Sequence, residues 1–103
     1  MKPSEILRKA KALIDTPEKW TQKAIARESL GIVVKFDAHN ATRLDSLGAL
    51  ARVDFYNVGK PIGYLNQAMG NIVTFNDTHT HAEVMAKWDE AIALAEADEN
   101  VKT

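Results

Sequence analysis

The sequence contains no cysteine, so disulfide bonds, thiolate metal sites and cysteine nucleophiles are all excluded. It also contains no run of about 18 apolar residues, and its first residues lack the apolar stretch of a signal peptide. Neither sign of charge is in clear excess, because 13 Lys and Arg residues are balanced by 14 Asp and Glu residues. General nucleic-acid binding, in contrast, needs a dense positive surface. We therefore expect a cytoplasmic protein without membrane contact, and we do not expect nucleic acid as its partner.

What is present is the composition of an ordinary globular domain, with 46% hydrophobic and 26% charged residues in a chain of 103. This length predicts a single domain over residues 1–103, with a folded core over residues 4–97 and a frayed tail over residues 98–103. The charges are unevenly spread, because residues 1–40 are mildly basic and residues 77–103 are acidic. The acidic end therefore offers a surface that a basic partner would recognise.

The clearest local signal is the start of the last helix. A Thr-x-x-Glu sequence at residues 80–83 has the spacing of a capping box, in which each side chain accepts from the backbone N–H of the other residue. Apolar residues then recur at three- and four-residue steps, which predicts a helix from about His81 to Ala97, anchored on the core by Trp88. Asn and Asp side chains just before a helix commonly satisfy its first N–H groups. We therefore predict structural capping roles for Thr80, Glu83, Asn76 and Asp77.

Three further helices are predicted from the same kind of periodicity, over residues 4–15, 42–55 and 61–69. The second of them contains Gly48. A glycine costs a helix interior roughly 0.8–1.0 kcal/mol relative to alanine, so we expect another element to approach closely there. The third helix is expected to end at Gly70, a helix-stop glycine.

Two stretches are predicted to be extended. Residues 32–36 are rich in β-branched side chains and follow Gly31, so we expect them to form a hairpin with residues 24–27. Residues 72–75 are also expected to be extended. An isolated hairpin is marginally stable in water, so this one must pack on the helices. The predicted fold class is therefore α+β: mostly helical, with about four helices and a small β-hairpin packed against them.

Four short motifs occur in order along the chain: Trp20-Thr21-Gln22, Gly48-Ala49-Leu50, Phe75-Asn76-Asp77 and Glu83-Val84. This ordered set resembles a family of small uncharacterised bacterial and phage proteins, a domain of unknown function whose pattern is similar to Trp-x-Gln, Gly-Ala-Leu, aromatic-Asn-Asp and Glu-Val. The resemblance covers about residues 5–95. It implies a compact, mostly helical domain with a small β element and a phage or prophage origin, and it implies no reaction.

One cluster has the residue types of a metal site. His79 and His81, with Asp77 nearby, offer the imidazole and carboxylate groups that suit zinc and other divalent ions. A metal site needs three or four converging ligands, whereas the predicted capping box starts the helix after Thr80 and leaves His79 outside it. These three residues are therefore weak metal candidates, and we expect no cofactor.

Neither a nucleophile–base pair nor a phosphate-binding loop is recognisable, so we expect no enzymatic activity. The leading hypothesis is a small protein-interaction module of phage or prophage type that inhibits a host or phage protein. Its candidate contacts are Trp20, which is either a core residue or a binding platform, and three acidic residues of the last helix, Asp89, Glu90 and Glu96. A homo-oligomer is also compatible with the sequence.

Two alternatives from other functional classes stay open. One is a small metal- or ligand-binding domain that uses the region of His79, His81 and Asp77. The other is a small DNA-binding regulator in which the helix over residues 61–69 belongs to a helix-turn-helix, although that helix carries few basic residues.

Overall fold

The last helix, α5 (His81–Val101), begins at the predicted capping box. The structure is a computed structural model and describes residues 1–101. In it the Thr80 N–H donates to a Glu83 carboxylate oxygen over 2.9 Å, and the Glu83 N–H donates to the Thr80 hydroxyl over 3.2 Å. The predicted capping box is confirmed, so the start of this helix is fixed by its local sequence.

The end of α5 differs from the prediction. Fraying is expected from residue 98, but the helix continues to Val101. The Tyr64 hydroxyl donates to the Asp98 carboxylate over 2.7 Å, which ties the last turns of α5 to the preceding part of the chain. Residues 102–103 of the predicted tail lie outside the described residues.

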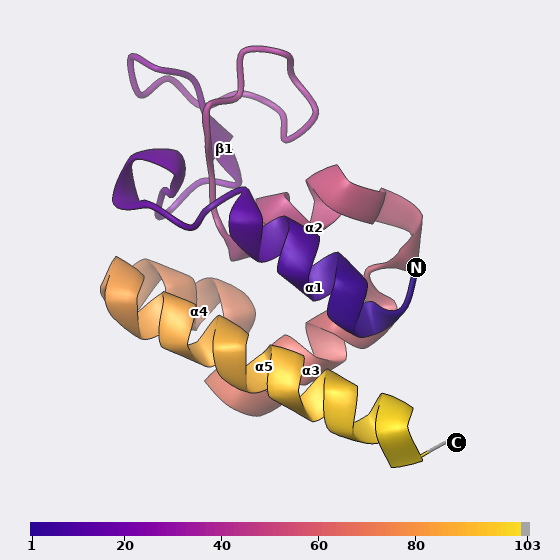
Figure 1. The fold of residues 1–103 in the computed structure, drawn as a ribbon. Coiled ribbons are helices and arrows are strands. Elements are labelled where there is room, and N and C mark those ends of the chain that lie inside the picture. The colour runs from indigo at the N-terminus through magenta and orange to yellow at the C-terminus, as the bar shows by residue number, and fades with distance from the viewer. Residues whose placement is uncertain (102–103) are drawn as a thin grey trace.

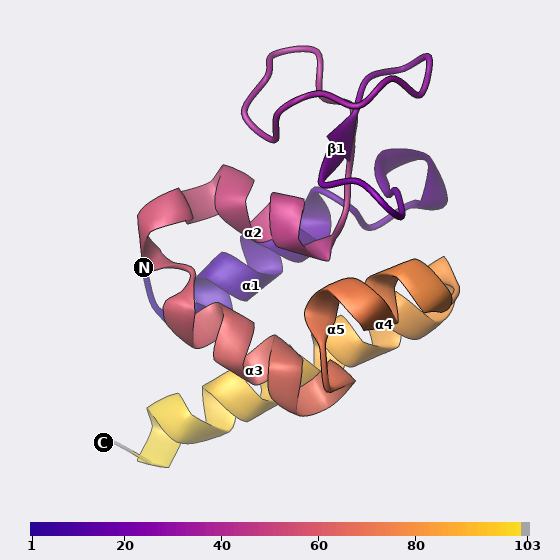
Figure 2. The ribbon, with the colours of Figure 1, turned by 180° about the vertical axis from the view of Figure 1, so that it is seen from behind.

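Within residues 1–101 the chain forms five α-helices, two 3-10 turns and one two-stranded antiparallel sheet. In chain order these elements are α1 (Pro3–Ala12), η1 (Pro17–Lys19), β1 (Ala26–Arg27), β2 (Arg43–Leu44), α2 (Ser46–Asp54), η2 (Phe55–Asn57), α3 (Gly59–Met69), α4 (Ile72–Thr78) and α5. The predicted α+β class is confirmed, with one helix more than expected. Figures 1 and 2 show the helices packed together, while residues 20–45, which we call the arm, project from one side of them.

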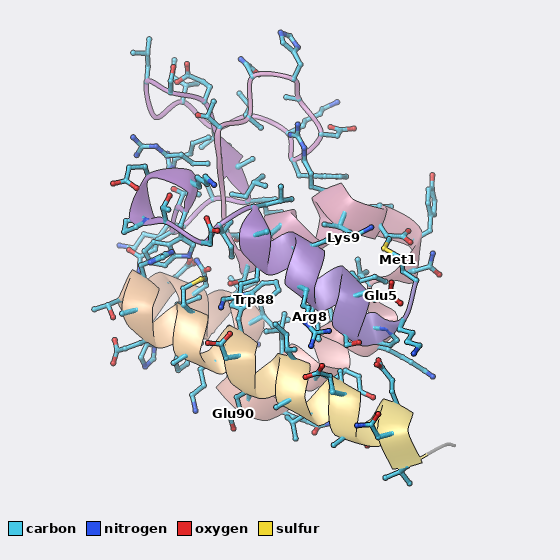
Figure 3. The ribbon with its side chains drawn as sticks, in the orientation of Figure 1. Met1, Glu5, Arg8, Lys9, Trp88 and Glu90 are labelled. Atoms are coloured by element: carbon cyan, nitrogen blue, oxygen red, sulfur yellow. The ribbon has the colours of Figure 1, made fainter. Side chains whose placement is uncertain are left out.

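The core lies where α1, α2, α3 and α5 meet. Trp88 of α5 is fully buried there, as its predicted anchoring role requires, and it lies between α5 and α1 in Figure 3. Its indole N–H donates to the Ser46 hydroxyl over 3.1 Å, so the polar atom of the ring is satisfied inside the core. Leu7, Leu50 and Leu65 are fully buried as well, and each comes from a different helix. One apolar cluster therefore joins the four helices.

A short helix, α4, replaces the extended segment predicted at residues 72–75. Gly70, with a φ of +84°, ends α3 as expected. The Asn71 side chain then accepts from the Thr74 N–H over 2.9 Å, which caps a new helix at once, and Ile72 is buried against the core. The β-branched run is misleading here because capping and burial outweigh an intrinsic preference that spans only about 1 kcal/mol.

The sheet pairs β1 with β2, and not with residues 32–36 as predicted. The hairpin turn itself is present, since Gly31 has a φ of +90° and the Val34 N–H donates to the Ala26 carbonyl over 3.1 Å. That contact is limited to one isolated bridge, so the segment does not become a regular strand. As a result β1 lies between β2 on one side and residues 32–34 on the other.

The next helix, α2, begins later than predicted. Its cap is Asp45, whose carboxylate accepts from the Gly48 N–H over 2.7 Å, because residues 43–44 are taken up by β2. The close approach expected at Gly48 is confirmed, since a Cβ atom there would overlap the carbonyl oxygen of Ile25. The backbone of the arm at Ile25 therefore packs directly on the first turn of α2.

Candidate functional site

Two of the sequence motifs meet at one side chain, Asn76, which is fully buried in α4. Its Oδ1 accepts from the Trp20 indole N–H over 2.8 Å and from the Ser46 hydroxyl over 2.9 Å. Its Nδ2–H donates to the Thr21 carbonyl over 3.0 Å. One amide therefore joins the start of the arm, the start of α2 and α4.

Neighbouring residues of the same motifs also hold the arm. The Gln22 side-chain amide donates to the carbonyls of Asn76 and His79 over 3.0 and 2.9 Å. The Asp77 carboxylate accepts from the Lys23 N–H over 2.8 Å, and Lys23 has a φ of +64°, a conformation that non-glycine residues adopt uncommonly. We call this network the arm joint; its side chains are Trp20, Gln22, Ser46, Asn76 and Asp77.

The arm joint connects structural elements and has the properties of a structural network. Across residues 1–101, every buried side-chain nitrogen and oxygen has a hydrogen-bond partner, so the joint holds no spare buried donor or acceptor for a ligand. Trp20 is half-buried with its N–H engaged, which favours the interpretation as a packed residue over a binding platform. The predicted capping roles of Asn76 and Asp77 are wrong in detail, because both residues lie inside α4 and neither caps α5.

Beside the arm joint lies a buried carboxylate, Asp45, which is 3% exposed. Burial raises its pKa to about 6; the nearby Asp77 acts in the same direction and the hydrogen bond from the Gly48 N–H opposes it. Shifted carboxylates are common in active sites, but this one caps α2, and its own N–H donates to the Ile25 carbonyl over 3.0 Å. Its expected effect is therefore on the pH dependence of folding.

The histidines are engaged separately with backbone carbonyls. The His79 ring stacks on Phe75, and its Nδ1 lies 3.0 Å from the Phe75 carbonyl oxygen. The Nε2 atom of His81 lies 2.7 Å from the carbonyl oxygen of Ile14. In the part of the chain that the structure describes, no three His, Asp or Glu side chains are placed to hold a metal ion, so His79, His81 and Asp77 do not converge as ligands.

The acidic residues of α5 are engaged with basic side chains of the same chain. Lys11 of α1 pairs with Asp89 over 2.6 Å, and Arg8 pairs with Glu96, as the position of Arg8 between the two helices in Figure 3 illustrates. Glu90, which faces away from α1, pairs with a lysine within α5 over 3.1 Å. The uneven charge of the sequence is thus partly compensated inside the chain, and we place the candidate interaction surface elsewhere.

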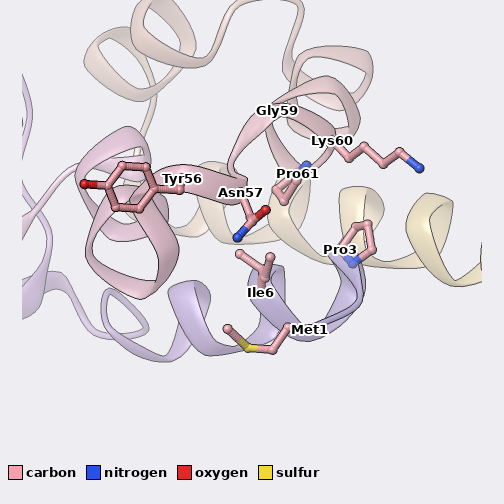
Figure 4. Close-up of a pocket in the computed structure, with 8 residues that line it drawn as sticks. All are labelled: Met1, Pro3, Ile6, Tyr56, Asn57, Gly59, Lys60 and Pro61. Atoms are coloured by element: carbon pink, nitrogen blue, oxygen red, sulfur yellow. The ribbon is translucent and has the colours of Figure 1, made fainter.

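Two exposed aromatic residues in η2, Phe55 and Tyr56, form what we call the aromatic corner. Tyr56 is 90% exposed and Phe55 is 55% exposed. Phe55 stacks on Phe36 with ring centroids 5.4 Å apart and meets Tyr56 edge-to-face at the same separation. Beside the corner a pocket of about 430 Å³ opens between the first turns of α1 and α3 (Figure 4). Its lining includes Met1, Pro3, Ile6, Tyr56, Lys60 and Pro61.

The aromatic corner is a feature that the sequence-based predictions missed. The helix predicted over residues 42–55 ends inside the corner, and Tyr56 is assigned no role. The one local signal in the sequence is that two adjacent aromatic residues directly precede Asn57-Val58-Gly59, a segment that is expected to end a helix. A helix that stops there exposes its last side chains, whereas a longer helix would bury part of that face.

Comparison with known proteins identifies one family. The model of DUF6197, a family of unknown function, matches residues 1–94. The chain belongs to this family. The match includes the whole arm and every residue of the arm joint, in agreement with the resemblance to a domain of unknown function. No curated protein and no solved structure matches the chain. Among the helices of residues 1–101, none combines the length and apolar character needed to cross a bilayer.

Proposed function

We propose that this family member is a small protein-interaction module of phage or prophage type that binds a host or phage protein and inhibits it. The observation that carries the proposal is the exposure of the aromatic corner, Phe55 and Tyr56, beside a pocket that Tyr56 helps to line. The phage or prophage origin rests on the family resemblance alone.

The aromatic corner has the chemistry of an interface anchor. Tyrosine is enriched among the residues that dominate binding energy, because its ring offers a large contact area and loses little conformational entropy. The corner is also held in place before any partner arrives, since Phe55 is stacked on Phe36 and braces Tyr56. A pre-ordered aromatic pair reduces the entropic cost of association.

The adjoining pocket supports the same proposal. Its apolar wall is formed by Pro3, Ile6 and Pro61, and Lys60 contributes one positive charge. A pocket of about 430 Å³ can take a few side chains of a protein partner. The lining is mixed, so the partner segment that fits it combines apolar and polar groups, with an acidic group near Lys60.

The test uses Tyr56→Ala as the perturbation and Val73→Ala as the matched control, because Val73 is also an exposed apolar residue but lies on α4. The tagged wild type and both variants are used to capture proteins from nuclease-treated lysate of the natural host. We expect one stoichiometric protein to be retained by the wild type and by Val73→Ala, and its affinity to fall roughly 30-fold or more with Tyr56→Ala.

Because the Tyr56 ring is in solvent, the Tyr56→Ala variant is expected to unfold at the same denaturant concentration as the wild type. Recovery of the wild type without any partner would contradict the proposal, and so would equal capture by the Tyr56→Ala variant. No specific observation favours either alternative function. For a metal site, the candidate ligands do not converge within residues 1–101. For DNA binding, α3 offers Lys60 as its single cationic residue.

A further inference from the structure

The outer edge of the arm, residues 32–35, runs antiparallel to β1. The Val34 N–H donates to the Ala26 carbonyl over 3.1 Å, and the Glu28 N–H donates to the Ile32 carbonyl over 2.9 Å. These two bonds flank the pair of Arg27 and Val33. In a pair that is flanked in this way, each residue directs its own N–H and C=O away from the other residue. Val33 therefore presents one backbone donor and one acceptor outward.

The outward backbone carbonyls on either side of Val33 are already used. The Gly31 carbonyl accepts from the Arg27 guanidinium over 2.9 Å, and the Lys35 carbonyl accepts from the Ala38 N–H over 3.1 Å. Between Gly31 and Lys35, Val33 is thus the one residue whose two outward backbone groups are both unused, and the Lys35 N–H is the one further outward donor. A long foreign strand would gain little from this edge, because it would meet a single acceptor, the Val33 carbonyl.

The side chains around this edge are apolar and exposed. Leu30 is 85% exposed at the tip of the turn, and Ile32 and Val33 are exposed beside it. A groove of about 410 Å³ lies along the other end of the same edge, lined by Ile25, Val33, Val34, Lys35, Phe36 and Asp37. An uncovered apolar edge is a template on which another chain can pair.

We propose that a second copy of this chain occupies the edge, in an antiparallel pair whose two-fold axis passes beside Val33. A residue on such an axis donates to and accepts from its own counterpart, so two identical hydrogen bonds satisfy both outward groups of both chains. The outward backbone groups of Val33 are therefore fully used by a second copy.

The neighbouring side chains are self-complementary about the same axis. Antiparallel pairing centred on Val33 sets Ile32 opposite Val34 of the second copy, and it directs Leu30 toward Phe36 of the second copy. The most exposed aliphatic side chain of the arm is thereby brought to the groove, and symmetry fills both grooves at once. A single foreign peptide would fill one groove only.

The charges of the arm also fit this register. The turn of each copy carries Arg27 and Glu28, and the facing end of the other copy carries Lys35 and Asp37. Each turn and each facing end is therefore neutral, with one charge of each sign, so no excess of like charge opposes the approach. This inference is separate from the proposed function, because it concerns the pure protein and a different set of residues.

The first experiment measures mass by sedimentation equilibrium up to about 1 mM protein, a concentration at which even weak specific association is visible. The edge is short, so a weak dimer is expected. For the wild type we expect the mass to rise with concentration toward twice the monomer value of 11.4 kDa. The Val33→Pro variant removes the outward N–H without touching the internal bonds, and we expect it to stay monomeric. Val33→Thr keeps the backbone donor and the branched shape, and we expect it to associate like the wild type.

A second measurement does not depend on how the Val33→Pro variant folds. The natural chain has no cysteine, so a Val33→Cys variant carries one thiol. Hydrogen-bonded antiparallel partners have Cα atoms about 5.5 Å apart, within the disulfide range. Under mild oxidation we expect the Val33→Cys variant to form a disulfide dimer at least tenfold faster than a Ser29→Cys variant, whose thiol is also at an exposed position but lies off the axis. A wild type that stays monomeric throughout, a Val33→Pro variant that associates normally, or equal cross-linking of the two cysteine variants would overturn the proposal.

Discussion

Replacing Asp45 by asparagine isolates the effect of one buried carboxylate on stability. Asp45 is 3% exposed, and burial raises its pKa from 3.8 to about 6. Asparagine caps helices as well as aspartate does, so the hydrogen bond from the Gly48 N–H is kept while the charge is removed. The substitution therefore changes the electrostatics of the site and leaves its geometry in place.

The sign follows from proton linkage. Because the pKa of the Asp45 carboxyl is higher in the folded state, the folded chain holds a proton between about pH 4 and about pH 6 that the unfolded chain has released. The free energy of unfolding therefore falls as the pH rises through this window, and the whole penalty is present above about pH 6. The rise in the pKa of Asp45 from 3.8 to about 6 corresponds to about 3 kcal/mol of unfolding free energy, which is an upper limit. At about pH 7.5 we expect the Asp45→Asn variant to be more stable than the wild type by up to that amount, and at about pH 4 to be roughly equal.

The assay is urea denaturation of both proteins across this pH range, analysed as the difference in unfolding free energy. The difference is needed because other carboxyls have the opposite effect: hydrogen bonds from Thr80 lower the pKa of Glu83, and the Ser4 hydroxyl lowers that of Glu99. Those groups stabilise the fold above their ordinary pKa and lose that effect on acidification, equally in both proteins. A flat difference for Asp45→Asn, or a variant less stable at neutral pH, would refute the linkage argument.

Three further substitutions and one matched control test the arm joint, the close approach at Gly48 and the start of α5. Asn76→Ala leaves the Trp20 N–H, the Ser46 N–H and the Thr21 carbonyl without their partner, which should cost about 3–6 kcal/mol in urea denaturation; a loss below about 1 kcal/mol would show that water replaces the amide. Gly48→Ala places a Cβ on the Ile25 carbonyl and should destabilise by about 1–3 kcal/mol, whereas Gly63→Ala on α3, which meets no atom within 4 Å, should stabilise by up to about 1 kcal/mol. If both glycine variants are stabilised, the arm does not press on α2. Thr80→Ala removes one half of the capping box and should lower stability by about 1 kcal/mol, visible as a lower thermal midpoint; no change would mean that solvent caps α5 equally well.

The parts of the fold that were predicted correctly depend on residues close together in the chain. The start of α5 needs only Thr80 and Glu83, and the stop at Gly70 needs one residue that tolerates positive φ. The burial of Trp88 follows from helical periodicity alone. Even the close approach at Gly48 is visible in the sequence, because a glycine inside a helix needs a reason.

Two errors concern segments that have the composition of a strand but do not form one. Residues 32–36 have the composition of a strand, but β1 takes its regular partner from β2, and no local pattern distinguishes the two pairings. Residues 72–75 have the same β-branched character, yet the cap at Asn71 and the burial of Ile72 make them helical. Strand preference mostly measures how well a side chain fits a half-buried surface, and that surface exists only after folding.

The candidate site shows the same limit. The residues of the arm joint could be named from the sequence, but not their contact, because the Trp20 N–H meets the Asn76 side chain across 56 residues of chain. The two histidines and Asp77 lie close together in sequence and have the residue types of metal ligands. In the structure, however, His79 contacts the carbonyl of Phe75, 4 residues away, whereas His81 contacts the carbonyl of Ile14, 67 residues away. Nearness along the chain does not make side chains converge.

The residues that carry the family resemblance have structural roles inside the fold. Trp20, Gln22, Asn76 and Asp77 fix the arm to the helices, and Gly48 admits the arm to the first turn of α2. Such residues report how the domain is built, so a chain can share all of them without sharing a partner. What distinguishes one binding specificity from another must then lie among side chains that the fold does not need. Tyr56 and Leu30 are of this kind: both are large and more than four-fifths exposed, so burial in the core of residues 1–101 does not account for either side chain.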